Sequence, residues 1–217
     1  MSESLSHIAL IDRLGSALVP VQRLAPPWRR TLGWLLLVVA IALGLLMHYG
    51  PGGMVQRWAV APALAWAGLG AAMTAVCAAW AAFALGVPGR RVTWAWLPLP
   101  AALLWLGASG LGCLRAWFTS EPPFGALQQS GDCLLFIIGL SIPLSVLLIV
   151  LLRRACPLRP VLTAVLVGLA SAAASAALLE IGHATDSAAT DLLTHALAVG
   201  VVVAINAAMG GRLLSRA

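Results

Sequence analysis

Few residues in this 217-residue chain could do chemistry, and several of them gather near position 180. Glu180 and His183 are three residues apart and would share one face of a helix, with Asp186 about one turn beyond. Together with the thiolate of Cys133, they could offer carboxylate, imidazole and sulfur ligands to a soft or borderline metal ion. A single Glu-x-x-His is a weak signal, and the alternative is that these side chains are solvated at the outer end of an apolar segment.

Motifs of the common catalytic sites are absent from the sequence. The chain has no Gly-x-Ser-x-Gly, no His-Glu-x-x-His, no phosphate-binding glycine loop and no Cys-x-x-Cys. We therefore expect a protein that is not an enzyme and that carries no cofactor.

The elements that must position these residues are long apolar helices. The chain is 61% hydrophobic and 9% charged, with a mean hydropathy of +0.98, which is far from the composition of a soluble domain. A helix needs about 20 apolar residues to cross the hydrocarbon core of a membrane. Runs of about this length occupy residues 32–49, 59–85, 92–111, 133–152, 161–181 and 192–209. The sequence predicts an all-α polytopic membrane protein with six transmembrane helices.

Every basic residue is an arginine, and the arginines sort by side of the membrane. With the N-terminus inside, only Arg57 and Arg115 of the thirteen fall outside. This bias predicts that both termini are cytoplasmic, and it explains the net charge of +6 without a nucleic-acid partner. An alanine-rich chain with arginine and no lysine is typical of GC-rich bacterial genes, so we expect a bacterial inner membrane.

The predicted spans carry little polar chemistry. None has a charged residue near its middle, where ion paths and transport sites usually place one. Asn206 is expected to bond between helices, and the small residues at 168–176 predict that the fifth span packs centrally. Pro98, Pro100 and Pro143 are expected to bend the third and fourth spans.

The N-terminal segment has an amphipathic pattern that a membrane span does not require. Apolar residues recur there at helical spacing of three and four: Leu5, Ile8, Ile11, Leu14 and Leu18. The polar side of this stripe carries one arginine and two acids, whereas helices that lie on lipid usually have a strongly basic face. A protein partner is therefore favoured over the lipid surface. We divide the chain into a cytoplasmic binding segment, 1–30, and a transmembrane domain, 31–217.

A proline-rich stretch joins this segment to the first span, and here the sequence resembles a known family. Its motif residues are Pro20, Val21, Arg23, Leu24, Pro26 and Pro27, followed by Arg29 and Arg30. The order Cys133, Pro143, the arginine-proline turn at 153–160 and the glycine-arginine ending at 210–214 extend the likeness over nearly the whole chain. These features resemble the negative regulator of sigma F type of six-span bacterial anti-sigma factors.

The resemblance implies that the N-terminal segment holds an extracytoplasmic-function sigma factor at the lipid bilayer and releases it on a stress signal. Val19, Gln22 and Ala25 stand where the family commonly has arginines, so an electrostatic part of sigma binding would be weaker here.

Sensing in the family is associated with two outer-face cysteines, of which this chain retains Cys133 as a thiol at the membrane surface. The second would lie beside His183, where this chain has Ala184. Cys113 could replace it, and a disulfide with Cys133 would close a loop of about twenty residues, worth ~3 kcal/mol in the loop-entropy model. The alternative is that Cys113 is only a small packing residue.

Two other classes of function compete with the regulator. A small transporter is disfavoured because the spans lack intramembrane charge. A membrane redox protein that binds haem or quinone would draw its ligands from His48, His183 and His195, which all cluster toward the outer side.

Overall fold

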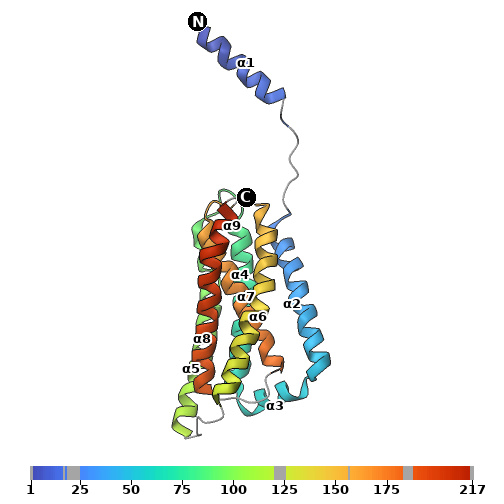
Figure 1. Ribbon diagram of the computed structural model, residues 1–217, viewed down its shortest axis with the longest axis vertical. Helices are drawn as coiled ribbons and strands as arrows, with labels where there is room; N and C mark the ends of the chain where they lie inside the picture. The colour runs from blue at the N-terminus through green and yellow to red at the C-terminus, as the bar shows by residue number, and fades with distance from the viewer. Residues whose placement is uncertain are drawn as a thin grey trace.

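The computed structural model describes residues 2–16, 18, 25–119, 126–155, 157–182 and 188–215; residues 2–6, 112–119, 126–130, 188–194, 211 and 215 are described by their backbone alone. This part of the chain is helical and contains no strand. Six of the described helices are long and apolar enough to cross a membrane, which confirms the predicted fold class. They run up and down as one bundle, and both termini point to the same end (Figure 1).

The helices in chain order are as follows. The first is α1 (Ser2–Ser16), and the bundle comprises α2 (Pro27–Tyr49), α3 (Gly52–Val60), α4 (Pro62–Leu85), the 3₁₀ helix η1 (Val92–Trp96), α5 (Leu99–Thr119), α6 (Ala126–Arg153), α7 (Pro160–Gly182), α8 (Ala188–Ile205), the π-helix η3 (Asn206–Gly210) and α9 (Gly211–Ser215).

Prolines set several helix ends that the apolar runs alone placed wrongly. The second span was expected to begin at residue 59, but α3 ends at Val60 and α4 begins at Pro62. Ala61 between them has φ −130° and ψ 83°, because the residue before a proline is pushed away from helical backbone. Pro98 likewise lies at the junction of η1 and α5, so the third span is interrupted there, while Pro143 lies inside α6.

The centre of the bundle is built from small side chains on α4 and α7. Nearly all of α7 from Thr163 to Leu179 is buried, which confirms the predicted central position of the fifth span. Close approach requires glycine at two places. A Cβ on Gly70 of α4 would lie 2.7 Å from the backbone nitrogen of Trp105 on α5, and a Cβ on Gly168 of α7 would lie 2.9 Å from the Cα of Val203 on α8.

Buried polar side chains join α6 to its neighbours. The Ser141 hydroxyl donates to Ser175 of α7 at 3.1 Å. The amide of Asn206, where α8 gives way to the π-helix η3, donates to the Ser145 hydroxyl at 3.1 Å and to the Val202 carbonyl at 2.9 Å. The predicted interhelical role of Asn206 is therefore confirmed. In a membrane such bonds average about 0.6 kcal/mol each, so they select the packing more than they stabilise it.

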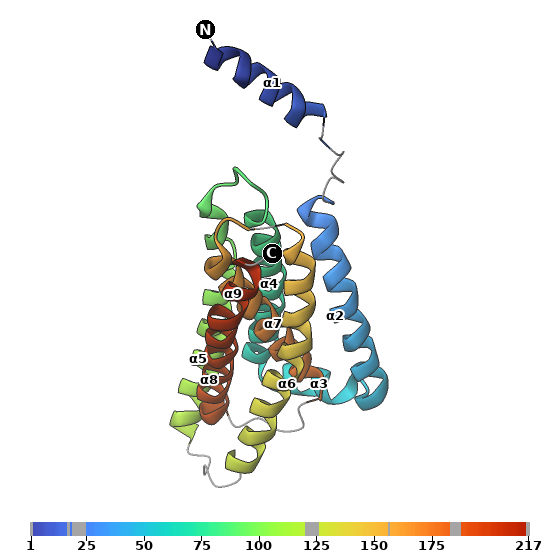
Figure 2. The same cartoon turned by 45° about the horizontal axis from the view of Figure 1, so that its top comes forward.

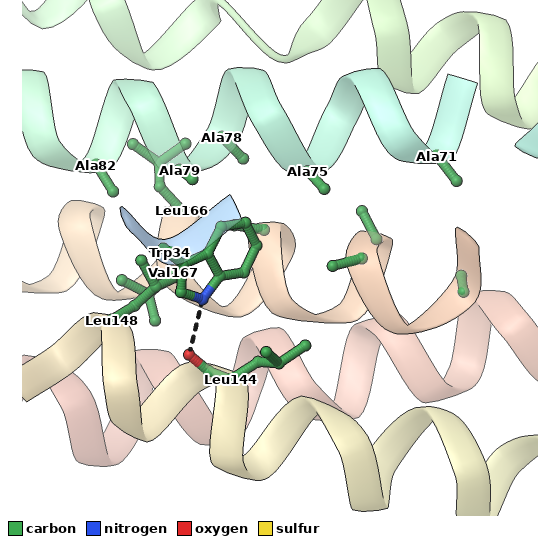
Figure 3. Close-up of a cluster of buried hydrophobic side chains, with 14 of the residues drawn as sticks. Trp34, Ala71, Ala75, Ala78, Ala79, Ala82, Leu144, Leu148, Leu166 and Val167 are labelled. Atoms are coloured by element: carbon green, nitrogen blue, oxygen red, sulfur yellow. Dashed lines mark hydrogen bonds between the residues drawn. The ribbon is translucent and has the colours of Figure 1, made fainter. Parts of the chain in front are cut away.

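Helix α2 is fastened to the bundle mainly near its beginning. Of its residues only Thr31 and Trp34 are buried, although the helix is 23 residues long. The Trp34 side chain is fully buried, and its indole N–H donates to the Leu144 carbonyl of α6 at 3.3 Å (Figure 3). Its ring lies between Val167 of α7 and the alanines of α4. The rest of α2 lies along the outside of the bundle (Figure 1).

Candidate functional site

Helix α1 presents the predicted apolar stripe to solvent. Ile8, Ile11, Leu14 and Leu18 are 63%, 69%, 60% and 78% exposed, whereas the side chain of Leu5 lies outside the described residues. The helix stands clear of the bundle, beyond the end that holds the C-terminus (Figure 2). Ile8, Ile11 and Leu14 share one exposed face of α1, whereas Leu18 lies beyond Ser16, where the helix ends, so the predicted helical stripe is shorter by this residue.

The motif that follows α1 is described only in part. Pro20, Val21, Arg23 and Leu24 fall outside the described residues. Pro26 has an extended backbone, with φ −58° and ψ 149°, and Pro27 is the first residue of α2. Proline suits this position because the first N–H groups of a helix have no intrahelical acceptor. The two prolines thus mark where the transmembrane helix begins.

Arginines surround the place where the N-terminal segment joins the bundle. We call this the arginine-rich end, defined by Arg29, Arg30, Arg90, Arg91, Arg153, Arg154, Arg159 and Arg212. The Arg30 guanidinium lies 4.6 Å from the ring centre of Phe83 and donates to the Leu151 carbonyl of α6. Arg30 therefore ties the first turn of α2 to α4 and α6, next to the Trp34 contact.

The side chain of Cys133, which the sequence predicts to be an outer-face thiol, points into the bundle. Its side chain is only 3% exposed and belongs to the apolar core, because Cys133 lies on the inward face of α6. Cys113 lies on α5 with its side chain outside the described part, and His183 is outside it altogether. The pairing of the two cysteines, and the joint sensing role of these three residues, remain predictions.

In the structure, Glu180 lies close to Arg57, an arginine for which the sequence predicted no contact. The guanidinium of Arg57 on α3 donates to the backbone carbonyl of Glu180, near the end of α7. Within the described residues no group of three or more histidine, cysteine or acidic side chains could hold a metal ion. The metal-site hypothesis also involves His183 and Asp186, which lie outside those residues, so it stays a hypothesis.

The histidines considered for haem occupy different helices. His48 is exposed near the end of α2, where its ring meets Tyr49 edge-on at 4.7 Å. His195 of α8 lines a pocket of about 300 Å³ between α5, α7 and α8. The described residues do not bring these two rings into one site.

Sequence reasoning missed helix α3 and the role of Arg57. A signal was available, because Arg57 is one of only two arginines on the minority side in the predicted topology. In the structure, the Arg57 guanidinium contacts the carbonyl end of α7.

The chain from residue 14 to residue 215 matches the family model described as "Negative regulator of sigma F". This protein belongs to that family. No curated protein and no solved structure matches the chain. The family match covers all six apolar helices and begins at Leu14 of α1, so Ile8 and Ile11 precede the matched residues.

The family name states negative regulation of a sigma factor, which implies a sigma factor as the partner of this protein. Of the surfaces described here, the stripe on α1 is the one whose apolar side chains share a face and lie clear of the bundle. The family description also agrees with a function other than catalysis.

Proposed function

We propose that this protein is a membrane-bound anti-sigma factor of the bacterial inner membrane. Its cytoplasmic N-terminal segment, residues 1–30, sequesters an extracytoplasmic-function sigma factor, and a stress signal received by the transmembrane domain releases it. The observation that carries the proposal is the exposed apolar stripe of α1 in a chain that belongs to a family of sigma-factor regulators.

The stripe is suited to a protein groove. Ile8, Ile11 and Leu14 provide the repeated anchors with which an amphipathic helix fills a hydrophobic groove, and the exposed Leu18 follows two residues after the helix ends. A 15-residue helix is only marginally stable alone in water, so burying this face in a partner would stabilise both the helix and the complex. The proline-rich motif from Pro20 to Pro27 would continue the contact toward the membrane.

The charge distribution supports a cytoplasmic site. The arginine-rich end is the end from which α1 extends, and Arg57 lies at the opposite end, on α3 (Figure 1). Positively charged segments remain on the cytoplasmic side during insertion. This orientation brings α1 into the compartment that contains sigma factors.

The attachment of α2 suggests how a signal reaches α1. Arg30 and Trp34 fasten the beginning of α2 to carbonyl groups of α6, the helix that also carries Cys133. A chemical change at Cys133, acting with Cys113 or His183, would have to alter packing because the Cys133 thiol is buried. A shift of α6 would then move the carbonyls of Leu144 and Leu151, to which Trp34 and Arg30 of α2 donate hydrogen bonds.

The proposal is tested by binding between the full-length protein and its cognate sigma factor. Leu14→Asp would bury an unpaired carboxylate in the interface, and a cost of about 3 kcal/mol lowers the affinity roughly 100-fold. Ala9→Asp is the matched control, because Ala9 is exposed on the other side of α1. We expect co-purification to be lost with Leu14→Asp and kept with Ala9→Asp, with equal membrane insertion.

Two results would contradict this function. The first is a chain without residues 2–25 that still binds the sigma factor. The second is an equal loss of binding in both aspartate variants, which would mean that the helix itself, and not its apolar face, is required.

A further inference from the structure

Four arginines from two helices gather where the beginning of α2 meets the end of α6. The Arg30 guanidinium donates to the Leu151 carbonyl, which lies two residues before Arg153, the last residue of α6. Arg29 precedes Arg30 on α2, and Arg154 directly follows α6. Arg30 is half-buried and the other three arginines are exposed. We call Arg29, Arg30, Arg153 and Arg154 the α2–α6 arginine cluster.

No acidic residue of the described bundle lies near this cluster. The acidic residues of its helices are found toward the opposite ends of α6, α7 and α8: Asp132, Glu180 and Asp191. Arg30 itself contacts the ring of Phe83 and a backbone carbonyl, neither of which carries a net charge. Like charges that are held together repel one another, and a partly desolvated cation gains most from a nearby anion. The cluster is therefore suited to an anionic ligand.

Both helices continue from the cluster into an exposed apolar face. On α2 the exposed Leu32 and Leu36 follow Arg29 at helical spacing of three and four. On α6 the exposed Val146 and Val150 precede the arginine pair at its end with the same spacing. The two helices lie side by side in both views of the bundle (Figures 1 and 2). A ligand at the cluster would thus find apolar surface next to the positive charge.

Trp28 indicates the depth of the cluster in the membrane. Its side chain is 46% exposed, and the Arg29 guanidinium lies 5.1 Å from its ring centre. Tryptophan side chains favour the boundary between lipid and water because the ring is apolar and its N–H is polar. Both residues belong to the first turn of a helix that is long and apolar enough to cross a membrane. The cluster therefore lies at the level of the lipid headgroups.

We propose that the α2–α6 arginine cluster binds the headgroup of an anionic phospholipid. Guanidinium groups donate paired hydrogen bonds to phosphate oxygens, and the acyl chains would lie along the exposed apolar faces of α2 and α6. A zwitterionic headgroup also carries a cation, which the arginines would repel, so a lipid with net negative charge is favoured. An acidic protein surface would meet the charges but not the apolar faces. Lipid binding is independent of the proposed sigma-factor function.

Native mass spectrometry of the full-length protein tests this site. The protein is titrated in detergent with phosphatidylglycerol or with phosphatidylcholine of the same acyl chains. Both lipids contain a phosphate, but only phosphatidylglycerol has a net negative charge. The first phosphatidylglycerol should bind at least about tenfold more tightly than the first phosphatidylcholine, the effect of one charged hydrogen bond. Equal affinity for the two lipids would overturn the proposal.

Two matched double variants separate a site from the general attraction of a basic surface. Arg153→Gln/Arg154→Gln removes two charges from the cluster, whereas Arg90→Gln/Arg91→Gln removes two exposed charges from the same end of the bundle. The first should lower the phosphatidylglycerol affinity about tenfold or more without changing the phosphatidylcholine affinity, and the second should keep the preference. Arg29→Gln, at an exposed position on the other helix, should also weaken phosphatidylglycerol binding. Equal losses in the two double variants would refute a specific site.

An acidic protein surface is the competing occupant. In that case both double variants would bind phosphatidylglycerol like the unaltered protein, but Arg153→Gln/Arg154→Gln would lower the affinity for the sigma factor in phosphatidylcholine nanodiscs. This result would overturn the lipid site and leave the proposed sigma-factor function standing. A lost phosphatidylglycerol preference with unchanged sigma-factor affinity would support the lipid site.

Discussion

The contact between α4 and α5 at Gly70 gives a stability prediction that the geometry makes quantitative. An alanine at this position would place its methyl group 2.7 Å from the backbone nitrogen of Trp105 and 2.8 Å from its Cα. Ordinary contacts of this kind begin at about 3.4 Å. Both atoms belong to the backbone, so no side chain can rotate away. Helix α5 must therefore retreat from α4 by several tenths of an ångström.

The expected cost follows from two opposing effects. Overpacking of this type costs about 1–3 kcal/mol. Replacing glycine by alanine inside a helix returns up to about 1 kcal/mol of helix propensity. Gly107→Ala on α5 is a control for the second effect alone, because no atom lies within 4 Å of its added Cβ. Gly70→Ala should therefore be less stable than Gly107→Ala by about 1–3 kcal/mol.

Reversible unfolding with sodium dodecyl sulfate measures this difference. Both variants are purified in the same mild detergent, and loss of helix is followed by far-ultraviolet circular dichroism. The midpoint for Gly70→Ala should move to a lower fraction of denaturing detergent than the midpoint for Gly107→Ala. Equal midpoints, or a more stable Gly70→Ala, would show that α4 and α5 do not meet through backbone at Gly70.

Three further outcomes are expected. Topology reporters fused at Pro157 should read cytoplasmic and those at Gln128 periplasmic, because the arginines favour that orientation; the reverse pattern would refute it. A double-mutant cycle of Asn206→Ala with Ser145→Ala should give a coupling of about 0.6 kcal/mol in unfolding free energy, and no coupling would contradict the hydrogen bond between them. Cys133→Ser should leave sigma-factor repression intact but abolish induction, measured with a reporter gene; normal induction would mean that Cys133 is not the sensor.

The amino-acid sequence was sufficient to predict the transmembrane helices because the bilayer imposes a local rule. Every backbone polar group in the hydrocarbon core must be bonded within its own helix, so an apolar run of sufficient length specifies a span without knowledge of its neighbours. The central place of α7 was also predictable from local sequence. Small residues such as Ala172 and Ser175 let neighbouring helices approach closely, so they are expected at helix contacts and not on a lipid-facing surface. The stripe on α1 followed from periodicity alone.

Contacts between residues far apart in the chain could not be obtained in this way. Whether Cys133 faces lipid or the core depends on how α6 is rotated within the bundle. The sequence of α6 is almost uniformly apolar, so it does not indicate which face of the helix turns inward. The contact of Arg57 with the carbonyl of residue 180 requires that α3 folds back onto α7.

The sequence by itself therefore determined the number of spans, the bias of positive charge toward one end and the amphipathic segment at the N-terminus, all of which depend on local composition. Only the tertiary structure decided that Trp34 and Arg30 hold α2 against α6, and that Arg57 of α3 contacts the end of α7. These features arise from side-chain shape and helix rotation. In a membrane the hydrophobic effect does not drive helices together, so close packing and a few polar bonds must choose among many arrangements that are equally apolar.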